Sequence, residues 1–463
     1  MENTIPDILG DGFQAELYYR RWYILSLFSL FSLFQCAVWN TWGPIAETAK
    51  NVYGWDDGDL TLLPLWGVVV FPVFSGPFAW LLGRSLRWAV AIAALLVVIG
   101  TFIRCIPILL PEQAVNFDIY CNTGAIFNAM AGPVAMAGPI QLSANWFPPG
   151  ERVAATGIGQ MFNALGIGVS FIFGTFLVRE ASDDCELDNV LCLNNESDLK
   201  LARDDINILL WVHGGASFIV FLLILLYFPS QPPKPPSISA TEPRTLFLEG
   251  FKTLIKSRTA WLTMITYSMS QGLVQMWQSV MIINILNLEI EGVTEKWASM
   301  LGLVISFVAV AASIGFAFFL NWFKKRMKLV LILLLGVSGI IFIFTTLLFQ
   351  GVFQFQDSNG FKIATYFLLL SGISLAYASA PLLFEFSVEL NYPVGEGTIG
   401  SWLTLWFNLF CICFLLIFQK PDSSTGWLNY VLPASVLGPL PLLFLVQENY
   451  NRLNIDEGKK PEL

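Results

Sequence analysis

Charged residues are scarce in this chain of 463 residues, at 13% of the total against about 25% in soluble globular proteins, which argues against a water-soluble fold. Histidine is almost absent: His213 is the only one, and we expect it at a helix end rather than in a pH switch. A single histidine excludes most metal and general-base sites, and the chain lacks a nucleophile elbow, a phosphate-binding loop and an H-E-x-x-H motif. We therefore expect no enzyme, no cofactor, no metal and no nucleic-acid partner.

Hydrophobic residues are abundant instead, at 55% of the chain. They fall in runs of about 20 residues, the length with which an α-helix crosses the hydrocarbon core of a bilayer. The runs begin near Trp22, Leu60, Trp88, Asn116, Val153, Ile206, Ala260, Trp297, Leu329, Ile363, Thr398 and Trp427. This pattern predicts an all-α membrane protein with twelve transmembrane helices embedded in the lipid bilayer. An even number of spans places both termini on one side.

Basic residues indicate the orientation, because Lys and Arg accumulate in loops that stay in the cytosol. A cytosolic amino terminus puts most of the 25 basic residues on the cytosolic side, so we expect both termini there. The loop after the sixth run is rich in proline and has no apolar period, which is typical of a linker. The predicted parts are a tail at 1–21, a six-helix bundle at 22–229 with an outer loop at 179–205, a linker at 230–258, a second six-helix bundle at 259–447 and a tail at 448–463.

The long outer loop carries two further signals. Asn195 begins an Asn-Glu-Ser acceptor sequence, and its place in a lumenal or extracellular loop predicts glycosylation, although such triplets also arise by chance. Cys185 and Cys192 lie in the same loop and are candidates for a disulfide on the oxidising side, with two free thiols as the alternative.

The two halves of the chain resemble each other at several points. The Trp-Asn-Thr sequence at 39–41 has a chemical counterpart in Trp-Gln-Ser at 277–279. Likewise, Asn-Trp-Phe-Pro at 145–148 corresponds to Asn-Tyr-Pro at 391–393, and a Gly-Glu pair follows each of the two. Matches at nearly constant separation indicate a tandem duplication, so we predict two pseudosymmetric six-helix bundles.

This duplication predicts where a substrate binds. Equivalent residues on equivalent helices face the central axis, so we expect Trp39 and Trp277 to confront each other across a cavity at the midplane. Indole rings offer stacking and cation–π surfaces, and neighbouring polar groups fix orientation by hydrogen bonds. The predicted substrate-binding residues are Trp39, Asn40, Thr41, Gln275, Trp277 and Gln278. The alternative is that both rings pack between helices or lie in an interfacial belt.

Ionisable groups inside the apolar runs are the other candidates. Glu385 and Glu389 lie one helical turn apart near the inner end of the tenth run, and two close carboxylates favour binding of a shared proton. They are candidates for proton coupling, with a solvated helix end as the alternative. Arg104 ends the third run and is a candidate for gating or for an ion pair with Glu47 or Asp118. Other polar residues in the runs fit either a hydrated path or interhelical hydrogen bonds, namely Gln141, Gln160, Asn163, Gln271, Gln275 and Asn408.

Paired six-helix halves with a short basic loop at 83–87 resemble the major facilitator superfamily. Several motifs are similar to those of solute carrier family 49 and, within it, of the "disrupted in renal carcinoma" branch. These are Trp-Asn-Thr-Trp-Gly-Pro-Ile at 39–45, Arg-Cys-Ile-Pro at 104–107, Trp-Phe-Pro at 146–148, Glu-Arg at 151–152, Phe-Glu-Phe-Ser-Val-Glu at 384–389 and Tyr-Pro-Val at 392–394.

The resemblance implies a proton-coupled secondary carrier for pyridoxine in the lysosomal membrane, whose partners are the small-molecule substrate and protons and for which a monomer suffices. It also implies that Trp39 lines the substrate cavity, and that Trp277 stands where choline-carrying relatives place a tyrosine. The alternatives are a carrier of choline, heme or another organic cation at the plasma membrane, or an uncoupled channel or receptor-like protein.

Overall fold

The computed structural model describes residues 16–110, 116–179, 181–182, 191–192, 196–288, 290, 293, 295–320, 325–353, 358–418 and 425–458. The helices of the first half are α1 (Arg20–Trp39), α2 (Ala46–Tyr53), α3 (Asp57–Arg84), α4 (Leu86–Cys105), α5 (Phe117–Trp146), α6 (Arg152–Leu177) and α7 (Glu196–Leu226). Two strands of two residues, β1 (Ala181–Ser182) and β2 (Leu191–Cys192), pair in parallel between α6 and α7.

The second half follows the short 3-10 turn η4 (Ile238–Ala240) and α8 (Phe247–Lys256). Its helices are α9 (Arg258–Tyr267), the π-helix η5 (Ser268–Leu273), α10 (Val274–Ser279), α11 (Met281–Leu286), α12 (Glu295–Leu320), α13 (Met327–Phe349), α14 (Ser358–Asn391), α15 (Glu396–Phe418), α16 (Leu428–Leu437) and α17 (Leu440–Leu445). A last short helix, α18 (Asn451–Asp456), closes the described chain.

The prediction of twelve membrane-spanning segments is confirmed, with one interruption. Within the described residues, eleven helical stretches are long and apolar enough to cross a membrane. The predicted seventh span is the exception, because it is divided into α9, η5, α10 and α11. A π-helix widens the helical turn and is often found at functional sites. The break therefore marks this span as a candidate part of the site.

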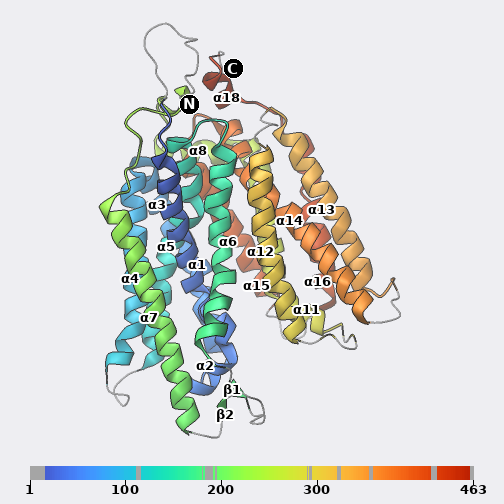
Figure 1. Ribbon diagram of the computed structural model, residues 1–463. Coiled ribbons are helices and arrows are strands. Elements are labelled where there is room, and N and C mark those ends of the chain that lie inside the picture. The colour runs from blue at the N-terminus through green and yellow to red at the C-terminus, as the bar shows by residue number, and fades with distance from the viewer. Residues whose placement is uncertain are drawn as a thin grey trace.

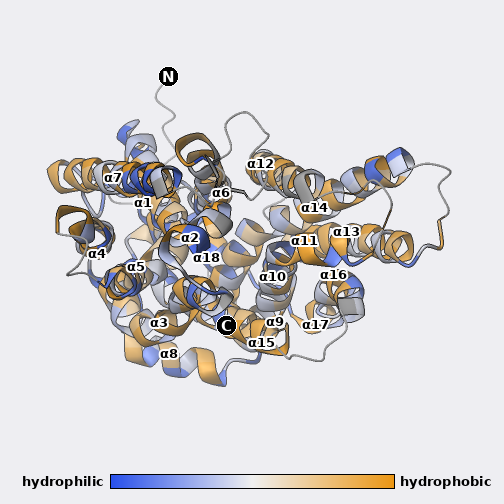
Figure 2. Cartoon of the chain, turned by 90° about the horizontal axis from the view of Figure 1, so that it is seen from below, coloured by the Kyte–Doolittle hydropathy of each residue, from blue (hydrophilic) through white to orange (hydrophobic). Residues whose placement is uncertain are grey.

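The helices form two bundles that lie side by side, with α1–α7 in one group and α9–α17 in the other (Figure 2). Helices α6 and α15 join the groups, because α6 contacts α12 and α14 while α15 contacts α3 and α5. Apolar side chains are exposed on the outer flanks, as expected where lipid covers them, and include Val73, Phe176, Leu226, Leu333, Ile363 and Phe367.

The two ends of the molecule differ. The described chain begins and ends at the same end of the bundles, where α8 and α18 also lie, and we call this end the terminal side (Figure 1). Helix α2 and the two short strands lie at the opposite end, which we call the distal side (Figure 1).

Two glycines allow α4 and α5 to cross closely. A Cβ atom on Gly100 would lie 2.6 Å from the carbonyl oxygen of Gly124, and one on Gly124 would lie 2.5 Å from that of Gly100. A Cβ atom on Gly124 would also lie 2.6 Å from Cγ of Arg104. Small residues let helix backbones approach in membranes, and here they also leave the space that the Arg104 side chain fills.

One expectation about a helix end needs correction. His213 does not lie at a helix end, because α7 begins at Glu196 and places the histidine well inside the helix, where it is buried. Within the tail predicted at 448–463, α18 folds onto the terminal side. Arg452 of this helix is buried.

Candidate functional site

A cavity of about 60 Å³ lies between the two bundles. Its walls come from α5 and α6 of the first half and from α9, η5, α10, α14 and α15 of the second. The polar lining residues are Gln160, Asn163, Tyr267, Gln271, Gln275 and Tyr377, and the apolar ones are Met136, Met161, Ala164, Ala380 and Phe407. None of the described residues that line it is charged. The cavity therefore combines aromatic surface with neutral hydrogen-bonding groups.

The side-chain amides that line this cavity differ in how many of their atoms have hydrogen-bond partners. The Asn163 side chain donates to the Ser32 carbonyl at 3.0 Å, and that of Gln271 donates to the Ala376 carbonyl at 3.0 Å. In contrast, neither the nitrogen nor the oxygen of the Gln160 amide has a partner among the described residues, although both atoms are buried. An unpaired buried amide costs free energy that a ligand can recover by supplying the missing bonds.

The predicted binding residues of the seventh span lie partly at the cavity. Gln275 lines it, and Gln278 accepts a hydrogen bond of 2.8 Å from the hydroxyl of the lining residue Tyr377. Trp277 does not line the cavity: its side chain is 0% exposed, and its indole N–H donates to the Leu428 carbonyl at 2.9 Å in the second bundle.

Trp39 does not face Trp277, the partner that the tandem duplication predicts for it. Its indole N–H donates to the Pro64 carbonyl of α3 at 3.0 Å, and its ring lies so close to Gly67 that a Cβ atom there would meet Nε1 at 2.3 Å. The two indoles thus do not face each other in this structure. Each N–H needs an acceptor in a nonpolar interior, and each finds one in its own bundle.

Asn40, Thr41 and Arg104 gather at the distal end of α1. The Arg104 guanidinium donates to the Val38 carbonyl at 3.0 Å and to the Thr41 hydroxyl at 3.4 Å, and it is buried. Thr41 also lies 3.4 Å from Nδ1 of His213, which brings the single histidine into this group. A cation at a helix C-terminus is stabilised by the helix dipole. Arg104 therefore caps α1.

Among the described residues Arg104 bonds to Val38 and Thr41 and forms no ion pair with Asp118, whose carboxylate accepts a hydrogen bond from the indole N–H of Trp55. The side chain of Glu47, the other suggested partner, is not described. The Asn40 side chain donates to the Ser170 hydroxyl of α6 at 2.8 Å and so joins α1 to α6.

Asn195 and Cys185 lie outside the described residues, and of Cys192 only the backbone, in β2, is described. Glycosylation and the disulfide stay predictions.

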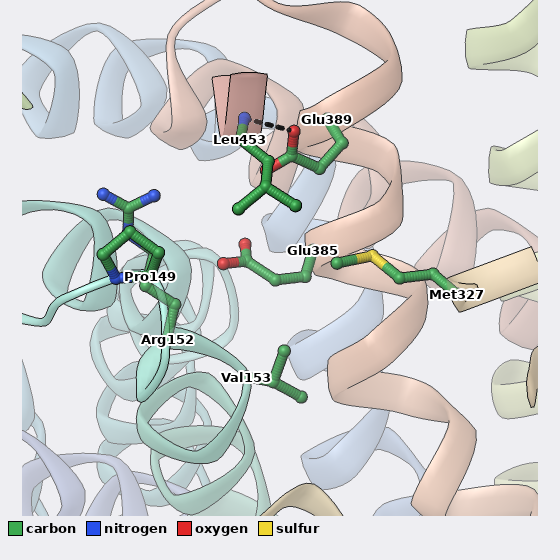
Figure 3. Close-up of a pocket in the computed structure, with 7 residues that line it drawn as sticks. All are labelled: Pro149, Arg152, Val153, Met327, Glu385, Glu389 and Leu453. Atoms are coloured by element: carbon green, nitrogen blue, oxygen red, sulfur yellow. Dashed lines mark hydrogen bonds between the residues drawn. The ribbon is translucent and has the colours of Figure 1, made fainter. Parts of the chain in front are cut away.

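The two candidate proton-coupling residues are buried at the terminal side. Glu385 and Glu389 are 3% and 4% exposed, which excludes a solvated helix end. Both line a small cavity of about 10 Å³, roughly enough for one water molecule, together with Arg152 of α6 (Figure 3). Oε2 of Glu385 has no hydrogen-bond partner among the described residues, whereas the Glu389 carboxylate accepts from the Leu453 backbone N–H at 3.1 Å.

Arg452 of α18 is the cation that faces these carboxylates. Its guanidinium lies 3.2 Å from Glu385, 3.8 Å from Glu389 and 3.7 Å from Glu396. Burial lowers the pKa of Arg452, but the carboxylates of Glu385, Glu389, Glu396 and Asp456 outweigh it and hold the pKa above its ordinary value. Arg452 therefore stays charged although it is buried.

Two further ion pairs complete the group. Arg152 donates to Asp456 at 2.9 Å, and Arg244 of the linker donates to Glu396 at 2.7 Å. We call this group the terminal charge cluster; its members are Arg152, Arg244, Glu385, Glu389, Glu396, Arg452 and Asp456. If all are ionised, four carboxylates face three guanidinium groups. One proton would neutralise the excess, and buried charges favour such neutrality.

Sequence reasoning missed most of these partners. Arg452 and Asp456 gave no signal because they lie in a short polar segment that nothing marked as folded. Glu396 had a weak signal, since the Gly-Glu pair at 395–396 repeats the pair at 150–151. Gln160 was one of several polar residues in the runs, and only its position in the cavity sets it apart.

Known proteins resemble the chain along most of its length. A profile of the Major Facilitator Superfamily matches residues 27–415. The Solute carrier family 49 member 4 homolog of Xenopus tropicalis is 31% identical over 439 residues, which cover 94% of this chain and 93% of that protein. The choline/ethanolamine transporter flvcr2b of Danio rerio is 25% identical over 429 residues, which cover 90% of this chain and 81% of that protein.

Solved structures resemble the fold. A variant of the E. coli fucose:proton symporter FucP superposes with a TM-score of 0.66 at 12% sequence identity, covering 92% of this chain and all of that one. A double tryptophan variant of XylE gives a TM-score of 0.66 at 10% identity, covering 92% of this chain and 95% of that one. At such identities the likeness concerns the fold alone.

Proposed function

The chain belongs to the major facilitator superfamily and, within it, to solute carrier family 49, and from this premise we propose that it carries pyridoxine together with protons across the lysosomal membrane. In this proposal the terminal side faces the cytosol and the distal side faces the lumen. The protein works as a monomer, and the two bundles move against each other to expose the central cavity to one side at a time.

The chemistry of the central cavity is the observation that carries this proposal. Pyridoxine is a small pyridine ring with three hydroxyl groups. The rings of Tyr267 and Phe407 offer faces for stacking, and the unpaired Gln160 amide offers one donor and one acceptor to hydroxyl groups. The absence of charge among the described lining residues suits a solute that enters as a neutral molecule.

The cavity must widen to admit such a ring, because about 60 Å³ holds little more than a few water molecules. The interrupted seventh span supplies the movable wall. Gln271 lies in the π-helix η5 and Gln275 in α10, and both line the cavity. Broken helices beside a binding site are a recurrent feature of secondary transporters.

Proton coupling is assigned to Glu385 and Glu389. The terminal charge cluster has one carboxylate more than it has guanidinium groups, and the free Oε2 atom of Glu385 faces a cavity of water size. A proton taken up there would weaken the attraction of the carboxylates for Arg452. Protonation would thereby loosen the closed terminal side, which is the link that coupled transport requires.

Choline or ethanolamine is the second candidate substrate. It rests on the similarity to the choline/ethanolamine transporter of Danio rerio and on the aromatic rings of Tyr267, Tyr377 and Phe407, which can attract a cation. Both molecules are cations at neutral pH and would meet no carboxylate among the described lining residues. We therefore rank it second.

The test is uptake by purified protein in liposomes, with radiolabelled pyridoxine, choline and ethanolamine compared at pH 5.5 and 7.5 outside and pH 7.5 inside. We expect saturable uptake of pyridoxine that is faster with the inward proton gradient. Saturable uptake of choline alone would replace the substrate, and pyridoxine uptake that ignores the gradient and its dissipation by an ionophore would remove the coupling.

A further inference from the structure

The short helix α18 carries two opposite charges on one face. Arg452 and Asp456 are four residues apart, so their side chains project from the same side of the helix. Both are almost fully buried, with side chains 1% and 3% exposed. Charged residues of a chain terminus are rarely buried unless they are paired. The helix is therefore held in the bundle by these two residues.

Arg452 connects α18 to the second half. Its guanidinium lies among Glu385 and Glu389 of α14 and Glu396 of α15. The backbone adds a contact, because the Leu453 N–H donates to Glu389 at 3.1 Å. All of these partners of Arg452 and Leu453 belong to the second half.

Asp456 connects the same helix to the first half. Its carboxylate accepts from the Arg152 guanidinium at 2.9 Å, and Arg152 is the first residue of α6. It also accepts from the backbone N–H of Ser239 at 2.7 Å and from the Ser239 hydroxyl at 2.9 Å. Ser239 lies in the linker turn η4. One helix of six residues thus spans the first half, the linker and the second half.

We propose that α18 is a latch for the closed terminal side, and that Arg452 and Asp456 are the residues that position it. To expose the cavity to the terminal side, the two halves must separate there. Helix α18 cannot follow both halves at once, so either the contacts of Arg452 or those of Asp456 must break in every cycle. This inference rests on alternating access, which the proposed function requires, and it does not depend on the identity of the substrate.

If α18 acts as a latch, loss of the Asp456–Arg152 ion pair should open the terminal side. Asp456→Asn removes the charge that holds Arg152 and leaves the contacts of Arg452 to the second half in place. We expect amide hydrogen exchange to rise about tenfold or more in peptides covering 152–160 and 384–391, because a broken buried ion pair lowers the free energy of opening. Hydrogen exchange followed by mass spectrometry on the purified full-length protein measures this without any substrate.

Glu457→Gln is the matched control. Glu457 follows Asp456 directly, but its carboxylate is 36% exposed and forms its ion pair of 2.6 Å with Lys325, in the second half. We expect exchange in both peptides to stay at the level of the unmodified protein. Folded Asp456→Asn protein with unchanged exchange would overturn the latch. A rise that Glu457→Gln reproduces would also overturn it, since general loosening of α18 would then explain the effect.

A measurement on the unmodified protein covers the case in which Asp456→Asn does not fold. Opening breaks either the contacts of Arg452, which releases the Leu453 N–H from Glu389, or those of Asp456, which releases the Ser239 N–H. We expect at least one of the peptides covering 237–242 and 447–458 to exchange together with 152–160 and 384–391. Persistent protection of both while 152–160 and 384–391 exchange would contradict the latch. Absence of pyridoxine uptake would refute the proposed substrate, but it would not change what the hydrogen-exchange measurement says about the latch.

Discussion

Arg152, the first residue of α6, donates to Asp456 of α18 at 2.9 Å, although 304 positions separate the two residues in the sequence. Their side chains are 2% and 3% exposed. Two charges taken out of water lose their hydration, and their mutual attraction together with further hydrogen bonds must offset that loss. This relationship ties the end of the described chain to the first bundle.

Removing the cation of this pair should therefore destabilise the protein. Arg152→Gln leaves the Asp456 carboxylate buried with only the hydrogen bonds from Ser239, and we expect a loss of about 3–5 kcal/mol in the free energy of unfolding. Thermal unfolding followed by intrinsic fluorescence in detergent gives the comparison. The control is Lys234→Gln, because the side chains of Lys234 and its partner Glu16 are each about half exposed and the loss of such an exposed pair should change stability only slightly. Equal decreases in unfolding temperature for the two variants would show that burial does not increase the contribution of the Arg152–Asp456 pair to stability.

The membrane fold could be predicted from the sequence because it depends on the lengths of apolar runs. Residues 329–349, for example, are almost wholly apolar and form α13. The division of the seventh span could not be predicted in this way, since residues 260–286 are also largely apolar. Within the π-helix η5, Gln271 bonds to the Ala376 carbonyl and the Ser379 hydroxyl of α14, which are tertiary contacts that the sequence of this span does not reveal.

The candidate site was only partly predictable for a related reason. The tandem duplication indicates which residues occupy equivalent positions, but it does not fix the rotation of each helix about its axis. A rotation that brings Gln275 to the cavity turns Trp277 into the second bundle. Glu385 and Glu389 were found because ionisable groups in apolar runs are rare, whereas Arg452 lies outside any run and gave no such signal.

The buried position of Trp277 leads to a prediction that separates packing from binding. Trp277→Ala removes a 0% exposed indole and should lower the free energy of unfolding by about 3–5 kcal/mol. Trp277→Phe keeps one aromatic ring and loses the pyrrole ring with its bond to the Leu428 carbonyl. Because Trp277 does not line the cavity, we expect an unchanged KM for uptake. Uptake kinetics and thermal unfolding of both variants provide the measurement. A stable Trp277→Phe protein with a strongly raised KM would return this residue to the binding site.

Gln160 is the residue of the cavity whose loss should affect substrate affinity most directly. Gln160→Leu keeps the approximate size of the side chain and removes the unpaired donor and acceptor. Because a hydrogen bond to a ligand contributes about 1 kcal/mol, losing two should raise KM for pyridoxine about thirtyfold if both atoms bind it. Gln350→Leu, at an exposed glutamine beside Tyr430, serves as the control and should leave KM as it is. A Gln160→Leu variant with normal KM would show that the substrate does not use this amide.

The orientation of the molecule is testable at Asn195. Helix α7 begins at the next residue, and this end of the helix lies with β1 and β2 at the distal side, which we propose to be lumenal. We expect the protein expressed in mammalian cells to carry one N-linked glycan. Treatment with peptide N-glycosidase F should increase its electrophoretic mobility, and Asn195→Gln should show that mobility without treatment. A glycan that persists in Asn195→Gln would place the modification elsewhere.

The terminal charge cluster gives the sharpest test of proton coupling. If Glu385 or Glu389 carries the transported proton, a permanently neutral side chain at that position removes the step in which the proton is bound. We expect Glu385→Gln or Glu389→Gln to flatten the increase of uptake that the unmodified protein shows as the pH on the distal side falls. Substrate exchange between equal pools should continue, because it needs no net proton movement. Glu249→Gln, at an exposed carboxylate of α8, should keep the normal pH dependence. Unchanged profiles in both cluster variants would remove these carboxylates from the mechanism, and Arg452 would then be paired with them only to hold the terminal side closed.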